Sequence, residues 1–198
     1  MGSPRGGRLL DVDDSVLCVV DVQPGFVKKL GETDGRGPFI QRVVWVVALA
    51  NALGVPIVVT EEEPDHNGST LPEIVEHLPD PTPRYAKPAF GLADVPEIMA
   101  AVEATGRHTA VLVGMETDVC VAHSALGLLD RDYRVVVVRD AVQSPGGAHD
   151  DGIERMRAAG VTLIGAKGLF YEWVRTGEVA WKIDDHMSSV PLPDGLTL

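Results

Sequence analysis

The chain has 198 residues, of which 45% are hydrophobic and 23% charged, a composition that suits a single globular domain with one buried core. Its 29 acidic and 17 basic side chains give a formal net charge of −12, which opposes contact with phosphate backbones and anionic membranes by Coulomb repulsion. We therefore expect neither nucleic acid nor a membrane as a partner.

Short valine-rich runs recur along the chain and predict β-strands. They are continuously apolar rather than alternating, which is typical of strands that are covered on both faces in a parallel sheet. In chain order they are residues 16–20, 55–60, 109–114, 134–138 and 161–165.

The segments between these runs show helical spacing of apolar residues, and three of the four end at or just before a glycine, as helices often do. They cover residues 39–53, 95–104, 119–129 and 152–159. Strands that alternate with helices, joined by right-handed crossovers, predict the α/β class. We expect a Rossmann-like three-layer α/β/α sandwich with a mainly parallel central sheet of five to six strands.

Other segments fall outside this alternation. Residues 61–90 hold six prolines and many charges, and we interpret them as an irregular excursion with one short helix near residues 73–78. Residues 1–14 and 186–198 are expected to be extended tails around a core of about 15–170, with the C-terminal tail wrapping a neighbouring subunit. The whole chain, 1–198, is then one domain.

The cellular compartment is suggested by the cysteines and by the first residues. Cys18 and Cys120 are too few for a disulfide framework, and residues 1–15 lack the apolar h-region of a signal peptide. The aliphatic runs are also far shorter than a membrane span. These features favour a cytoplasmic location.

Two charged residues are candidates for a reactive site. Asp21 directly follows the first strand, and reactive groups collect at the carboxyl ends of parallel strands. Taken alone, it could equally be a helix cap or a turn aspartate. Lys87 lies in the apolar stretch "RYAKPAFG", where an amine could stabilise a carboxylate or a developing anion; taken alone, it could be a solvated lysine.

Cys120 lies six residues after Gly114, at a predicted turn from strand into helix. With Thr117 or Asp118 as the cap, unpaired amides and the helix dipole there would favour the nucleophilic thiolate. The other interpretation is a small buried hydrophobic residue, which describes Cys18 well because it lies among valines in mid-strand.

Taken together, these residues match a family. The stretches "VVDVQPGF", "KPAFG", "VGMETDVCVAHSALGL" and "VVVVRDAV" follow one another in the order and spacing of the isochorismatase-like cysteine hydrolases, which include nicotinamidase and N-carbamoylsarcosine amidase. The chain resembles this family from about residue 15 to 165. The resemblance implies a catalytic triad in which Asp21 moves the proton, Lys87 holds that carboxylate, and Cys120 attacks the substrate carbonyl through a thioester.

The resemblance also implies an unusual backbone beside the cysteine. The family has a cis peptide at the position of Met115 and Glu116. Such a bond would turn the Glu116 amide toward the same point as the Cys120 amide and so form an oxyanion hole.

The choice among family activities depends on two departures from the family pattern. Nicotinamidases hold a metal with an Asp-x-His pair, whereas this chain has only Asp65, His66 and His77 in that region, so we expect no metal and no cofactor. Isochorismatases cleave a vinyl ether without a nucleophilic cysteine. We therefore expect hydrolysis of a small amide or carbamoyl compound, with vinyl ether hydrolysis, nicotinamide hydrolysis and non-catalytic binding as the alternatives.

Substrate contacts are expected from residues close to the triad in sequence. The aromatic residues would either pack the substrate or belong to the core, and the glutamate would either be solvated or turn inward and favour a cationic substrate. The family and the apolar segment at 43–53 further suggest a homodimer or homotetramer. The expected substrate-binding residues are Gln23, Phe26, Glu61, Phe90 and His123.

Overall fold

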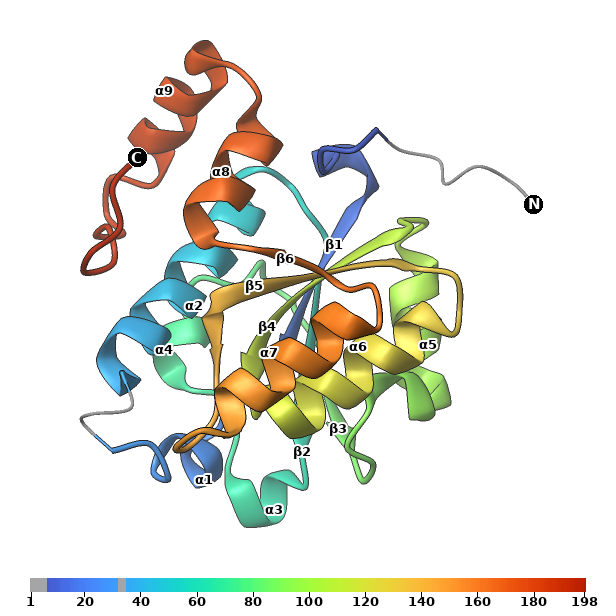
Figure 1. The fold of residues 1–198 in the computed structure, drawn as a ribbon. Helices are drawn as coiled ribbons and strands as arrows, with labels where there is room; N and C mark the ends of the chain where they lie inside the picture. The colour runs from blue at the N-terminus through green and yellow to red at the C-terminus, as the bar shows by residue number, and fades with distance from the viewer. Residues whose placement is uncertain (1–6, 32–34) are drawn as a thin grey trace.

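The computed structural model describes residues 7–31 and 35–198. Its centre is a six-stranded parallel sheet in the order β3-β2-β1-β4-β5-β6 (Figure 1). The predicted three-layer α/β/α sandwich is confirmed. The strands are β1 (Ser15–Val20), β2 (Ile57–Glu62), β3 (Arg84–Lys87), β4 (Thr109–Met115), β5 (Arg134–Gln143) and β6 (Thr162–Ile164).

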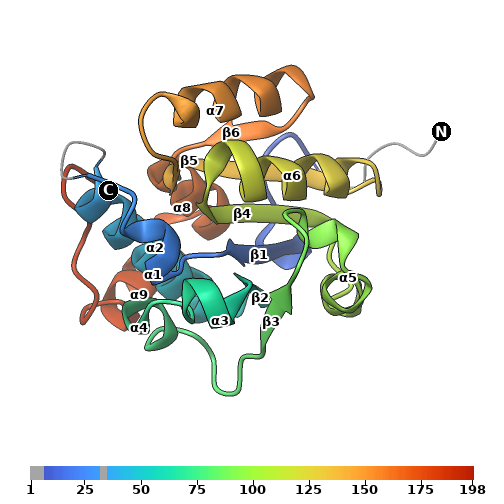
Figure 2. The ribbon, with the colours of Figure 1, turned by 90° about the horizontal axis from the view of Figure 1, so that it is seen from below.

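Helices cover both faces of this sheet, as Figure 2 shows from below. The α2 face, where Val19 and Val59 point, packs against α2 (Arg36–Ala52), α8 (Ala166–Val174) and α9 (Gly177–His186). The α6 face, where Cys18 and Val58 point, packs against α5 (Pro96–Ala104), α6 (Ala122–Leu129) and α7 (Ala148–Ala158). Because successive residues of a strand alternate between the faces, residue parity decides which side of the sheet each side chain reaches.

Helix α2 contains all but the last residue of the apolar segment at 43–53 that suggested an oligomer. Most of its side chains, Trp45 among them, are buried in the chain's own core, so this segment leaves no spare apolar face. Among the described helices, none is both long and apolar enough to cross a membrane. The exposed large hydrophobic residues of the described part are instead Leu9, Phe90, Tyr171, Trp181, Leu192 and Leu198.

The segment at 61–90 is more ordered than its composition suggests. It forms α3 (Pro64–Asn67), α4 (Pro72–Val75) near the expected short helix, and β3, which pairs with β2 at the edge of the sheet. An edge strand has a neighbour on one side only and needs few apolar residues, which is why "RYAK" carries no strand-like pattern. The prediction of an irregular excursion is therefore wrong for β3, and this strand delivers Lys87.

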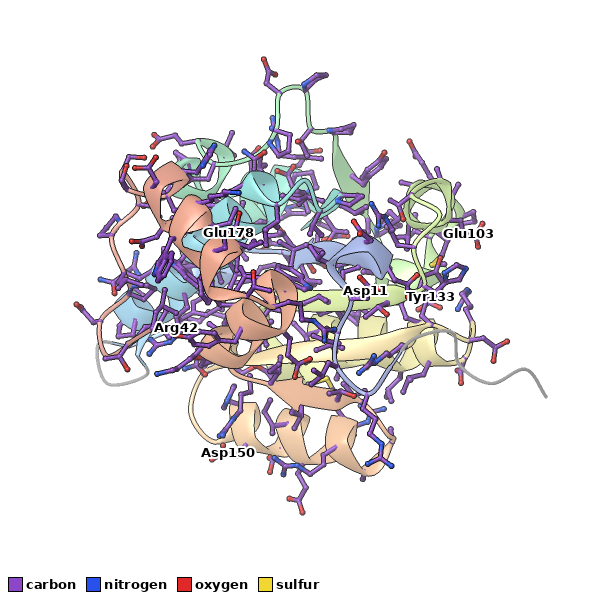
Figure 3. All side chains as sticks on the ribbon, turned by 90° about the horizontal axis from the view of Figure 1, so that it is seen from above. Asp11, Arg42, Glu103, Tyr133, Asp150 and Glu178 are labelled. Carbon is purple, nitrogen blue, oxygen red and sulfur yellow. The ribbon has the colours of Figure 1, made fainter. Side chains whose placement is uncertain are left out.

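The end of the chain packs back onto its own fold. Helices α8 and α9, which the sequence analysis did not predict, carry the chain to His186. Beyond them, the Asp194 backbone N–H donates to Gln41 Oε1 at 2.9 Å, and Arg42, labelled in Figure 3, donates to the Asp194 carbonyl at 3.2 Å. Near the other end, the Leu10 N–H donates to the Glu172 carboxylate; residues 1–6 of the expected N-terminal tail lie outside the described residues.

Candidate active site

Asp21, Lys87 and Cys120 meet at the carboxyl edge of the sheet. Asp21 follows β1, Lys87 is the last residue of β3, and Cys120 lies in the π-helical turn η4 (Thr117–Val121) after β4. The Lys87 Nζ lies 2.7 Å from Asp21 Oδ2, and the Cys120 thiol lies beside the same carboxylate. Three residues distant in sequence thus form one cluster with the aspartate in its middle.

The Asp21 carboxylate is fully buried and held on both sides. Its Oδ1 accepts from Thr60 Oγ1 at 2.7 Å, while its Oδ2 faces Lys87. Its backbone has φ of 50°, a left-handed value that is uncommon for a non-glycine residue, and its N–H donates to the Thr60 carbonyl at 3.1 Å. Burial raises the pKa of Asp21 above the usual aspartate value in spite of the charge of Lys87. A carboxylate in this state accepts a proton more readily than a solvated aspartate.

Lys87 is not a solvated lysine. Its side chain is fully buried, and Nζ donates to the carbonyls of Ala89 at 3.0 Å and Phe90 at 2.8 Å in addition to its ion pair with Asp21. Two carbonyl acceptors and one carboxylate charge thus surround the ammonium group. The amine is therefore held in one position beside the carboxylate.

Cys120 differs from the expected thiolate. Burial, followed by the negative charge of Asp21, raises its pKa to about 12, so the resting group is a thiol. The expected caps are used elsewhere: Thr117 Oγ1 lies 3.0 Å from His149 Nδ1, and Asp118 Oδ1 accepts from Ser144 Oγ at 2.6 Å. Loss of the thiol proton would then depend on the adjacent carboxylate and not on the helix terminus.

The backbone before the cysteine has two special features. Gly114 has φ of 123°, and a Cβ there would overlap the carbonyl oxygen of Val20 on β1, so only glycine lets the two strands approach this closely. The Met115–Glu116 peptide bond is cis, as the family resemblance implies.

Helix α7 supports the cysteine turn from outside. A Cβ at Gly152 would lie 2.7 Å from both Cα and N of Asp118, which is closer than side chains approach a backbone. The helix can therefore pack against η4 only because position 152 has no side chain. Gly147, at the start of the same helix, has open space around it.

We expect Gly152→Ala to displace η4 and lower kcat/KM by about 10²-fold, because a shift near 1 Å misaligns the reacting groups. Gly147→Ala, the matched control, should stay close to the parent in activity and in unfolding temperature. Activity assays and thermal unfolding of both variants would check this expectation. A fully active Gly152→Ala protein would show that the packing of α7 does not position the cysteine.

Two of the expected substrate-binding residues are occupied by contacts within the fold. Gln23 is fully buried and bonds to the backbone of Glu62 on both sides, donating to its carbonyl at 3.0 Å and accepting from its N–H at 2.7 Å. Glu61 points to the α2 face, where it accepts from the Thr70 N–H and hydroxyl at 2.8 Å and pairs with Arg84 at 3.4 Å. Both therefore organise the loops after the strands.

The other three expected residues lie differently. Phe26 is 8% exposed and belongs to the core, with the Lys29 amine 4.7 Å from its ring centroid. Phe90 and His123 are exposed and meet edge to face, with ring centroids 6.0 Å apart. The Phe90 carbonyl accepts a hydrogen bond from Lys87, and His123 lies one turn beyond Cys120. The contact between the two rings therefore connects the segment after Lys87 to the helix after Cys120.

The candidate metal ligands of the sequence are not gathered. Asp65 and His66 are exposed on α3, and the His77 backbone carbonyl accepts from Asn51. Within the described ranges, no three His, Cys, Asp or Glu side chains are grouped as metal ligands.

Two residues beside Asp21 and Lys87 were not predicted to belong to the site. Thr60 and Glu62 share the α6 face of β2, and they contact or face the cluster from the neighbouring strand. Residues two apart on a strand point to the same face, so extending the predicted strand to residue 62 would have placed Glu62 beside Thr60. The predicted strand stopped at residue 60 and left the glutamates outside it.

Comparison with known proteins shows the family to which the chain belongs. The model of the isochorismatase domain matches residues 15–168, which is most of the chain. The chain belongs to the isochorismatase family. This isochorismatase-family chain is 35% identical over 173 residues to the secreted isochorismatase effector Isc1 of Phytophthora sojae, covering 85% of this chain and 80% of that protein.

Solved isochorismatase-family structures superpose closely. YcaC from Pseudomonas aeruginosa, solved with hexane-2,5-diol and covalent acrylamide, has a TM-score of 0.83 and 27% identity over 92% of each chain. YcaC from Escherichia coli, described as an octameric hydrolase of unknown specificity, has a TM-score of 0.81 and 26% identity over 92% of each chain.

Proposed function

We propose that this isochorismatase-family hydrolase cleaves the C–N bond of a small amide or carbamoyl compound through a thioester on Cys120. The observation that carries the proposal is the position of the Asp21 carboxylate, which touches the Lys87 amine and the Cys120 thiol at once. A base between a nucleophile and a fixed cation is what covalent acyl transfer requires. Covalent acrylamide in the P. aeruginosa relative is consistent with a reactive site in this fold.

The first half-reaction begins with transfer of the thiol proton to Asp21 as Sγ attacks the carbonyl carbon. The carbonyl oxygen gains negative charge, and the N–H groups of Glu116 and Cys120 are the proposed donors to it. The C–N bond then breaks, Asp21 returns its proton to the leaving nitrogen, and ammonia or an amine departs. Cys120 is left as a thioester.

The second half-reaction uses water in place of the thiol. Asp21 takes a proton from water while the water oxygen attacks the thioester carbon. The C–S bond then breaks, and Asp21 passes that proton to the sulfur. The acid product leaves, and Asp21 and Cys120 regain their starting states. Lys87 keeps the Asp21 carboxylate in place and stabilises its charge when it is deprotonated.

The direct test is ammonia release from a panel of primary amides and carbamoyl compounds that includes nicotinamide, with isochorismate followed separately for vinyl ether cleavage. We expect at least one amide or carbamoyl compound to release ammonia catalytically. Cleavage of isochorismate alone would replace the proposal with a vinyl ether hydrolase. No turnover of any compound would favour a non-catalytic binding member of the family.

We also propose that the protein is a homo-oligomer, such as a dimer or tetramer. The support comes from the octameric E. coli relative and from exposed aromatic residues on α8 and α9. Trp181 is 77% exposed and Tyr171 is 47% exposed, values unusual for such large apolar side chains.

A further inference from the structure

We propose that Glu62 determines substrate charge at this site: its carboxylate favours substrates that carry an ammonium or similar N–H donor beside the scissile amide, and it disfavours anionic ones. This inference rests on the proposed amide hydrolysis and names its substrate class. It follows from the strand register, the contacts and the charges around the triad.

Strand register places Glu62 beside the triad. Its Cα pairs with that of Lys87 between the parallel strands β2 and β3, so both side chains project to the same face of the sheet. Thr60, two residues earlier on β2, projects to this face as well and bonds to Asp21. Glu61, between them, points to the opposite face. Of the two glutamates in β2, only Glu62 therefore lies on the side of the nucleophile.

Hydrogen bonds fix the Glu62 backbone and one of its carboxylate oxygens, but not the other oxygen. Its backbone is fixed by Gln23 through both the N–H and the carbonyl. Asn67 Nδ2 donates to its Oε2 at 2.6 Å and to its carbonyl at 3.0 Å. In the described part of the chain, no donor contacts the other oxygen, Oε1. The residue as a whole is 8% exposed, and Oε1 does not count among the fully buried atoms without a partner, so this oxygen stays open to a molecule in the site.

The charges around Glu62 Oε1 favour a cationic substrate group over an anionic one. Two acidic groups, Asp21 and Glu62, interact with the single cation Lys87, and Cys120 rests as a thiol, so acidic groups outnumber cations in the cluster. The nearby Lys29 is paired with Glu116 at 3.0 Å and leaves the balance unchanged. Burial, with the neighbouring acidic groups, raises the pKa of Glu62, although Lys87 acts in the opposite direction. A cationic substrate group would relieve this excess, whereas a substrate carboxylate would add to it.

Three primary amides of similar size test the proposal: 3-aminopropanamide as the cation, butanamide as the neutral isostere, and succinamate as the anion. The parent should prefer the cation to the anion. Glu62→Gln should lower kcat/KM for 3-aminopropanamide about tenfold or more, raise it for succinamate, and change it less than about threefold for butanamide. Glu63→Gln removes the same charge from the adjacent exposed residue and should change each of these ratios by less than about twofold, because water screens an exposed charge.

Some results would overturn the assignment. Equal losses for all three amides in Glu62→Gln would show a purely structural residue, and equal changes in Glu63→Gln would show a general charge effect. If no amide is hydrolysed, thermal-shift binding of the same compounds to Cys120→Ser, with and without Glu62→Gln, separates the two proposals. A cation preference that the glutamine removes supports Glu62 although the hydrolysis proposal has failed. Equal shifts, or none, overturn the role of Glu62.

Discussion

Cys120→Ala is expected to lower kcat/KM for an amide or carbamoyl substrate by about 10⁴-fold or more while the protein stays folded. The thioester cannot form without Sγ, and Asp21 alone can activate only water. Stability should fall by no more than about 1 to 2 kcal/mol, because the change removes a single buried atom. Steady-state ammonia release, together with urea unfolding of the same preparation, measures both effects.

Cys18→Ala is the matched control. Cys18 is also a buried thiol with a pKa raised to about 12, but it lies in mid-strand and has no carboxylate beside it. Its removal should leave kcat/KM within a few-fold of the parent. Turnover at the parent rate by Cys120→Ala would remove the nucleophile from the mechanism. Similar losses in both cysteine variants would instead indicate damaged packing.

The central strands of the fold were predictable because their burial on both faces leaves a pattern in each strand's own residues. A strand buried on both faces must be apolar at every position, and the runs at β1 and β4 show this in the sequence alone. Strand β3 is different: it lies at the edge, pairs only with β2, and has partly exposed residues up to Lys87. This segment is a strand because it pairs with β2, which lies more than twenty residues earlier, so its own residues show no strand pattern.

The gathering of Asp21, Lys87 and Cys120 was predictable from the sequence, whereas the contacts around them were less so. The sequence offers three consecutive glutamates, and only the register of β2 separates Glu62, on the side of the triad, from Glu61, on the other. Gln23 looks like a free polar group until the fold brings the Glu62 backbone to it. The pKa of Cys120 depends on burial and on Asp21, and both exist only after folding.

Lys87→Met is expected to abolish activity and also to destabilise the fold by about 3 to 5 kcal/mol near neutral pH, because it leaves the buried Asp21 carboxylate without its cation. Lys182→Met, at an exposed i,i+4 pair with Glu178, makes the same substitution where water screens the charge. It should cost less than about 1 kcal/mol. Urea unfolding of both variants at pH 7.5 measures the difference.

The pH dependence of this loss identifies its cause. Without Lys87, the folded-state pKa of Asp21 should rise further above its unfolded value of about 4, because the largest effect that opposes burial is then lost. A raised carboxyl pKa favours the folded state below the unfolded pKa, and this benefit is lost as the pH rises through the folded pKa. The deficit of Lys87→Met should therefore be smaller at pH 5 than at pH 7.5.

Replacing both partners separates the charge from the packing. Asp21→Asn with Lys87→Met removes the unpaired charge, so the double variant should be more stable than Lys87→Met at pH 7.5 and should lose most of the pH dependence. It should remain inactive, because no base is left to take the Cys120 proton. A double variant no more stable than Lys87→Met would mean that the lysine stem, and not the ion pair, holds the edge strand in place. Asp21 and Cys120 would then be brought together independently of the amine, and the site would need its cation only for chemistry.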